Sequence, residues 1–147
     1  MTATLMSERF TDVATKRYIF AGGGTGGQLF PALAIAEELK KLEPSSEILF
    51  VGTKDKLEAH IVPQHGYEFR SIWVSGFQRK SIFKNFLFPI KLFVSVMQSR
   101  AIIKEFKPSV VIGTGGYVAG PVLYAATMLK IPTAIHEQNS YPGITTR

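Results

Sequence analysis

Residues 18–31 read YIFAGGGTGGQLFP, and they contain the transition that decides the fold. The first four residues form an apolar run of the kind found in buried strands, and the run ends in glycines. A helix is expected over residues 30–41, because Pro31 suits a helix start and apolar residues follow at helical spacing. The segment therefore predicts a strand, a tight glycine turn and a helix in direct succession.

The glycines fit the dinucleotide-binding pattern only in part. Gly22, Gly24 and Gly27 satisfy GxGxxG, but this pattern also requires an acidic residue at the end of the second strand, where it binds the ribose hydroxyls. Here the second expected strand ends in VGTK at residues 51–54, and Asp55 follows too late. Dinucleotide binding is therefore disfavoured.

A nucleotide-hydrolysing P-loop is disfavoured for a different reason. Its lysine contacts the outer phosphates and the next Ser or Thr binds magnesium, whereas Gln28 and Leu29 occupy these positions here. Two interpretations remain. The glycines let a phosphate or diphosphate approach the backbone closely without lysine or metal, or they merely permit tight packing of the strand against the helix.

Strands and helices alternate along the rest of the chain. Further strands are expected at residues 47–51, 68–74, 109–112 and 132–135, and further helices at residues 54–62, 81–106 and 121–129, the first of these with exposed charges. Such alternation favours parallel strands joined by right-handed crossovers. The predicted fold class is α/β: a doubly wound, Rossmann-like parallel sheet with helices on both faces.

The glycine segment GTGG at residues 24–27 is repeated at residues 113–116. Each copy follows an expected strand and precedes a helix with an early proline, Pro31 or Pro121. Ligands of such sheets bind at the carboxyl ends of the strands, where helix N-termini offer free N–H groups. The repetition predicts two anion-binding corners of one design that face a common cleft.

The charge balance of the 147-residue chain indicates an anionic partner. Its formal net charge is +6 and its pI about 9.7, which suits nucleic acid, an acidic lipid surface or a phosphorylated substrate. The absence of Cys excludes disulfides and Cys-ligated metals. Residues 1–16 are interpreted as a loose polar tail, and no charge-free apolar stretch reaches the roughly 20 residues needed to span a membrane.

Residues 81–100, SIFKNFLFPIKLFVSVMQSR, are apolar on more sides than a core helix requires. Part of the segment follows one helical stripe, which is typical of core packing, but other apolar residues lie off that stripe. An apolar patch bordered by cations suits an anionic membrane surface, and cations that cluster with Phe and Leu disfavour nucleic-acid binding. Membrane contact is predicted, with core packing alone as the alternative. The predicted membrane residues are Phe83, Lys84, Phe86, Leu87, Phe88 and Lys91.

Four motifs resemble, in order and spacing, the N-terminal half of the MurG family: GGTGGQLFPALAIAEEL, VGTKDKLEAHIVPQHG, KPSVVIGTGGYVAGP and IPTAIHEQNSYPG. The resemblance implies a peripheral-membrane GT-B glycosyltransferase, in which two Rossmann-like domains face each other across a cleft. Such enzymes move N-acetylglucosamine from UDP-N-acetylglucosamine to lipid I, the undecaprenyl-diphosphate-linked muramyl-pentapeptide. The anomeric carbon is inverted, and the product, lipid II, enters peptidoglycan synthesis.

The resemblance further implies that residues 17–147 are the acceptor-binding domain and that the C-terminal donor domain is missing. This chain alone is therefore expected to be inactive, although it belongs to an enzyme. The expected location is the cytoplasmic face of the bacterial inner membrane, with an anionic membrane surface as partner and without a cofactor, metal or nucleic acid. A non-catalytic binding module, or a truncated product that retains only the fold, is the alternative.

Site residues follow from this resemblance together with the two glycine segments and the end of the last expected strand. The predicted substrate-binding residues are Gly24, Thr25, Gly26, Gly27, Gly115, Gly116, Tyr117 and Asn139, and the catalytic candidates are Gln28, His136 and Glu137. The family usually has His at the position of Gln28, and Gln could orient a hydroxyl but not act as a general base. His136 and Glu137 could form an acid–base pair, or His136 could simply hydrogen-bond within its loop.

Overall fold

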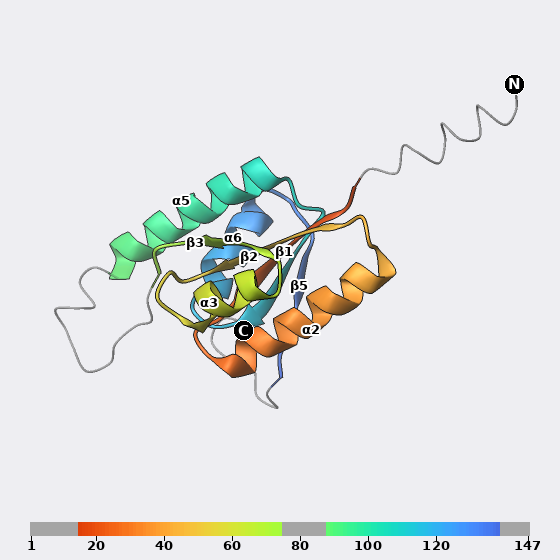
Figure 1. Cartoon of the computed structure of the whole chain (residues 1–147). Helices are drawn as coiled ribbons and strands as arrows, with labels where there is room; N and C mark the ends of the chain where they lie inside the picture. The colour runs from red at the N-terminus through yellow and green to blue at the C-terminus, as the bar shows by residue number, and fades with distance from the viewer. Residues whose placement is uncertain (1–14, 75–87, 139–147) are drawn as a thin grey trace, which may run out of the picture.

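A five-stranded parallel sheet forms the centre of the computed structural model, which describes residues 15–74 and 88–138 (Figure 1). The strand order is β3-β2-β1-β4-β5, with bounds β1 Arg17–Gly22, β2 Glu47–Gly52, β3 Glu68–Ser71, β4 Val110–Gly115 and β5 Thr133–Ile135. The helices are α2 Gly26–Leu42, α3 Leu57–Gln64, α5 Phe88–Phe106 and α6 Ala119–Met128. The predicted α/β class with parallel strands is confirmed.

The central strand β1 is paired on both edges. Ile19 lies opposite Leu49 of β2 and Val111 of β4, and all three side chains are fully buried. Chain order runs outward from β1 to β2 and β3, then returns to β4 and β5 on the other side of β1. The carboxyl ends of β1 and β4 are therefore neighbours at the point where the direction of winding reverses.

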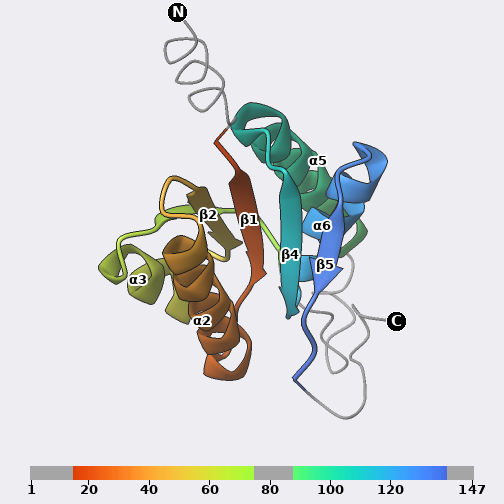
Figure 2. The same cartoon turned by 90° about the vertical axis from the view of Figure 1, so that its right-hand side faces the viewer.

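Alternate side chains of β1 enter two separate cores. Tyr18 and Phe20 pack with α2 and α3, and Phe20 stacks on Phe50 of β2 with ring centroids 5.2 Å apart. Ile19 and Ala21 point the other way, into the core beneath α5 and α6. Figure 2 shows these two pairs of helices on opposite faces of the sheet. A strand buried on both faces explains why its sequence is a continuous apolar run without polar alternation.

Two helices begin earlier than their prolines suggest. Helix α2 begins at Gly26 instead of residue 30, and α6 begins at Ala119 instead of Pro121. The first four N–H groups of a helix have no intrahelical acceptor, so proline fits anywhere in the first turn, and Pro121 is the third residue of α6. Pro31 lies beyond the first turn of α2, where it removes one backbone hydrogen bond without ending the helix.

Other boundaries also shift. Helix α3 begins at Leu57 instead of residue 54, and β3 ends at Ser71 instead of residue 74. The expected helix over residues 81–106 is confirmed from Phe88 onward, whereas its first seven residues lie outside the described part of the chain. Most of the expected polar tail, residues 1–14, also lies outside it. None of the described helices is long and apolar enough to cross a membrane.

Candidate functional site

The two glycine segments meet at the carboxyl edge of the sheet, as the sequence predicts. Gly22, the last residue of β1, lies opposite Gly115, the last residue of β4. Helices α2 and α6 begin just beyond these strand ends (Figure 2). The site therefore occupies the position where open α/β sheets bind their ligands, between adjacent strands whose connections run in opposite directions.

The two segments are not of one design, and this part of the expectation is wrong. In the first copy, Gly24 lies in the turn after β1, and Gly26 and Gly27 already belong to the first turn of α2. In the second copy, residues 113–115 are still part of β4. The same four residues occupy different structural positions in the two copies, because β4 continues beyond its apolar residues as far as Gly115.

The first segment presents backbone donors at a helix start. Gly23 and Gly24 have φ values of 146° and 89°, which lie in the region that glycine tolerates. Thr25 is extended at the N-cap and makes no side-chain capping bond. The N–H groups of Gly26 and Gly27 lie in the first turn, where helix geometry gives them no acceptor, and no acidic residue occupies this turn. Such an N-terminus favours an anion.

A buried carboxylate, which the sequence did not reveal, supports this turn from behind. Glu58 of α3 is 1% exposed, so the expectation of exposed charges in this helix is wrong for this residue. Its carboxylate accepts a hydrogen bond from the Gly24 N–H at 2.9 Å. It also accepts bonds from the N–H and hydroxyl of Thr53, at 2.9 and 2.7 Å. Burial raises the pKa of Glu58, but these donors outweigh it and leave the pKa below its ordinary value.

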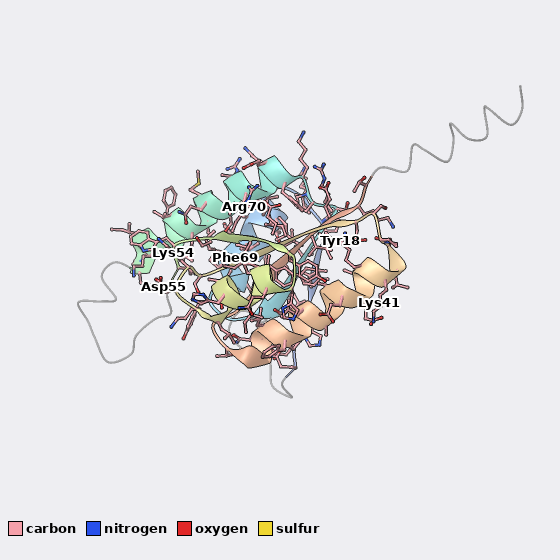
Figure 3. The ribbon with its side chains drawn as sticks, in the orientation of Figure 1. Tyr18, Lys41, Lys54, Asp55, Phe69 and Arg70 are labelled. Carbon is pink, nitrogen blue, oxygen red and sulfur yellow. The ribbon has the colours of Figure 1, made fainter. Side chains whose placement is uncertain are left out.

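The Glu58 carboxylate also bears on dinucleotide binding. Its hydrogen bond to Thr53 places it near the end of β2, where the dinucleotide pattern requires an acidic residue to bind ribose. However, the carboxylate is buried and bonded to the backbone. Lys54 and Asp55 lie in the turn between β2 and α3 and are exposed (Figure 3). An acidic group is thus present near the strand end, yet it is not available to a nucleotide.

Gln28 connects the two glycine segments. With the Gln28 amide oriented so that both of its ends meet a suitable partner, the side-chain nitrogen donates to the Gly23 carbonyl oxygen at 2.5 Å and the side-chain oxygen accepts from the Gly116 N–H at 3.2 Å. Gly115 and Gly116 have φ values of 105° and 86°, and a Cβ on either would contact the Gln28 side chain. The structure thus places Gln28 as a bridge between β1 and β4, and its role towards a substrate hydroxyl stays a prediction.

The remaining predicted residues lie at the same edge or outside the described residues. Tyr117 is 63% exposed, directly after the second glycine segment. His136 follows β5, where its N–H donates to the Gly113 carbonyl at 2.8 Å, and its buried Nδ1 has no hydrogen-bond partner among the described residues. Glu137 comes next and is partly buried. Asn139 lies outside the described residues. Within residues 15–74 and 88–138, no cluster of side chains could hold a metal ion.

The geometry defines a Rossmann-like α/β domain with a candidate anion site at its switch point. Residues 18–147 match the glycosyltransferase family 28 N-terminal domain. The chain belongs to this family.

Curated relatives resemble this chain over most of its length. It is 55% identical over 131 residues to the UDP-N-acetylglucosamine--N-acetylmuramyl-(pentapeptide) pyrophosphoryl-undecaprenol N-acetylglucosamine transferase of Christiangramia forsetii. The transferase of the same name from Clostridioides difficile is 52% identical. These alignments cover 89% of this chain but only 36% and 32% of the two relatives. The chain thus spans about a third of their length.

A solved structure supports the same assignment. The crystal structure of Acinetobacter baumannii MurG superimposes with a TM-score of 0.74 at 30% sequence identity. The match covers 88% of this chain and 36% of that chain. The resemblance to the MurG family, inferred from four motifs, is therefore confirmed at the level of sequence and of fold.

Two glycines of similar φ provide a test of the Gln28 bridge. At Gly116, a Cβ would lie 2.5 Å from the Gly23 carbonyl oxygen and 2.9 Å from the side-chain amide of Gln28. At Gly66, with a φ of 81°, a Cβ would meet no atom within 4 Å. We expect Gly66→Ala to lower the free energy of unfolding by about 1 kcal/mol through backbone strain alone. Gly116→Ala should lower it by roughly 2 kcal/mol more because of overpacking.

Urea unfolding of both variants measures this difference. Equal losses of stability would show that the two glycine segments are not held in contact through Gln28.

Proposed function

We propose that this chain is the acceptor-binding part of an N-acetylglucosaminyltransferase. The complete enzyme would move N-acetylglucosamine from UDP-N-acetylglucosamine to lipid I, with inversion at the anomeric carbon, and so produce lipid II for peptidoglycan synthesis. The observation that carries the proposal is the first turn of α2, which has no side-chain cap and lies at the switch point, in a chain whose relatives bear the name of that transferase.

The diphosphate of the acceptor is the proposed ligand of this turn. Gly24, Thr25 and Gly27 are exposed, so an anion has access to the N–H groups of Gly26 and Gly27. The Gly24 N–H is bonded to Glu58 and the Gly116 N–H faces Gln28, so neither is free for the ligand in this conformation. Of the two predicted anion-binding corners, the one at α2 is therefore better supported.

The transfer reaction also requires a base and contacts to the acceptor sugar, and other residues at the carboxyl edge of the sheet are candidates for these roles. A hydroxyl of the muramyl sugar attacks the anomeric carbon, the bond to UDP breaks, and a base accepts the hydroxyl proton. Gln28 cannot accept that proton, which leaves His136 and Glu137 as candidates on this domain. Tyr117 and Asn139 are proposed to contact the acceptor sugar, since both side chains can hydrogen-bond to hydroxyls.

A second Rossmann-like domain is proposed to complete the enzyme and bind the uridine diphosphate. In a GT-B arrangement it would face the carboxyl edge that carries the glycine segments. On this proposal the chain alone binds acceptor but does not catalyse transfer. The alternative, a binding module without chemistry, draws its support from Gln28 at the position where the family usually has His.

Helix α5 supports membrane association. Ile90, Phe93 and Met97 follow helical spacing and are 51%, 68% and 46% exposed, whereas Ser95 and Ser99 face the protein. Core packing, the alternative drawn from the sequence, is therefore wrong for these three apolar residues within the described structure. Phe88 and Lys91 are partly buried, and the other four predicted membrane residues, Phe83, Lys84, Phe86 and Leu87, lie outside the described part of the chain.

The position of α5 suits a substrate carried on a lipid. The helix begins at the edge of the sheet where the strands end, so its exposed apolar half lies at the same end of the domain as the glycine segments (Figure 1). Trp73 is 47% exposed nearby, with the Lys91 ammonium 5.3 Å from its ring centroid. Aromatic and cationic side chains together favour the interface of an anionic membrane. We propose the cytoplasmic face of the inner membrane as the location.

Deleting a single backbone donor tests the diphosphate site. Thr25 has φ −137° and ψ 157°, which is the conformation that a residue before proline prefers, and Gly26 is the first residue of α2. Gly26→Pro thus removes one N–H without breaking the helix, and Gly26→Ala is the matched control that retains it. We expect Gly26→Pro to bind a soluble short-chain lipid I analogue about tenfold more weakly than Gly26→Ala, the effect of one hydrogen bond to a charged group.

Isothermal titration calorimetry provides both dissociation constants, and UDP-N-acetylglucosamine is titrated in parallel. Equal acceptor affinities of the two variants would exclude the Gly26 N–H as a ligand donor. Tight donor binding without acceptor binding would overturn the assignment of this chain to the acceptor.

Charge placed on the apolar face of α5 tests membrane association. We expect Phe93→Asp to reduce cosedimentation with anionic liposomes several-fold, because a carboxylate at this position opposes both burial and anionic lipid. Leu42→Asp is the matched control, since Leu42 is 79% exposed at the far end of α2. Equal binding of both variants, or negligible binding of the unaltered chain, would contradict the membrane proposal.

A further inference from the structure

Among the residues that the structure describes, Glu58 carries the one buried charge, and the proposed transfer does not explain its role. The five ion pairs among the described residues use other carboxylates, those of Glu38, Glu43, Glu47, Glu68 and Glu105. Glu58 is instead compensated by three hydrogen-bond donors, two N–H groups and one hydroxyl. Burying an ionised carboxylate without a cation is unfavourable unless such donors are held in place.

These donors come from two segments that are distant in sequence. Gly24 belongs to the turn after β1, and Thr53 follows the last residue of β2. One carboxylate oxygen takes the Gly24 N–H, while the other takes both donors of Thr53. The carboxylate therefore connects the glycine turn to the neighbouring strand, so that the turn is fixed relative to the sheet.

The backbone around Glu58 leaves room for this side chain and little else. A Cβ on Gly23 would lie 2.4 Å from its carboxyl carbon, and a Cβ on Gly52 would lie 2.4 Å from its Cγ. Gly23 also has a φ of 146°. One carboxylate thus requires two glycines, Gly23 in the turn after β1 and Gly52 at the end of β2. This packing is one reason for the glycine at position 23.

The charge of Glu58 conflicts with the ligand that the turn is proposed to bind. The Glu58 carboxylate is bonded to Gly24, in the same turn that is proposed to bind the anion through the N–H groups of Gly26 and Gly27. The two negative charges would repel each other. A negative group in this place weakens anion binding through its charge. The presence of Glu58 is explained if the geometry that it imposes on the turn strengthens anion binding by more than its charge weakens it.

We propose that Glu58 is a positioning residue that holds the Gly23–Gly24 backbone so that the first turn of α2 presents its N–H groups to a phosphate group of the ligand. This inference rests on the proposed acceptor binding and extends it to a residue that does not contact the ligand. Glu58 touches no ligand and acts only through the turn.

Amide hydrogen exchange of the 147-residue chain tests the contact itself without any ligand. Gly24 is exposed, so its N–H should exchange slowly only because it is bonded to the buried carboxylate. We expect Glu58→Gln to accelerate exchange at Gly24 at least tenfold and to leave buried β1 amides unchanged. Unchanged exchange at Gly24 would overturn the proposal.

Binding of inorganic pyrophosphate at neutral pH then tests the positioning role. The unaltered chain is measured first, and a failure to bind would contradict the proposed function together with the role of Glu58 in it, whatever the exchange experiment shows. If the chain binds, we expect Glu58→Gln to weaken the affinity about tenfold although the variant removes a negative charge. Unchanged or tighter binding by the folded variant would overturn the positioning role, since loss of the charge alone favours the anion.

A second pair of variants covers the case in which Glu58→Gln fails to fold. Thr53→Val removes only the hydroxyl donor, and Thr53→Ser retains it. We expect Thr53→Val to weaken pyrophosphate binding about threefold and Thr53→Ser to bind like the unaltered chain. Equal affinities in this pair would contradict the proposal.

Discussion

Burial of β1 on both faces, between β2 and β4, is the constraint on which the site depends. Ile19 and Phe20 are fully buried in opposite cores, so a slip by one residue would move each side chain into the other core and lose the packing of both. This register fixes Gly22 beside Gly115 and so determines where the chain leaves the sheet. The turn after Gly22 and the first turn of α2 then lie at the switch point because the strand before them is fixed.

Three side chains on different elements stabilise that turn. Phe20 anchors the strand below it, Glu58 accepts the N–H of Gly24, and Gln28 bridges Gly23 to Gly116. The Glu58 and Gln28 contacts use backbone groups of the glycine segments and leave the N–H groups of Gly26 and Gly27 as donors for a ligand. The site thus combines an anion-binding helix start with a rigid support, and it contains neither a lysine nor a metal-ligand cluster among the described residues.

The sequence predicted the class of fold and the place of the site but not its internal contacts. Apolar runs that end in glycine identify buried parallel strands, and they located β1, β2 and β4 within a few residues. Proline was a poor guide to helix starts: Pro121 lies within the first turn of α6, which accepts proline at any position, and Pro31 lies deeper in α2, where it removes one backbone hydrogen bond without ending the helix. The burial of Glu58 was missed because a single carboxylate in a short helix is usually solvated. Only the packing of Gly23 and Gly52 around it reveals its role.

The central claim is that the first turn of α2 binds the diphosphate of a lipid-linked acceptor. Amide chemical shifts of the isotopically labelled chain, recorded during titration with a soluble short-chain diphosphate acceptor analogue, test it most directly. The account predicts the largest shifts at Gly26 and Gly27, with smaller shifts at Gly24 and Gly116. Shifts confined to the basic residues of α5, or spread evenly over the basic surface, would contradict it.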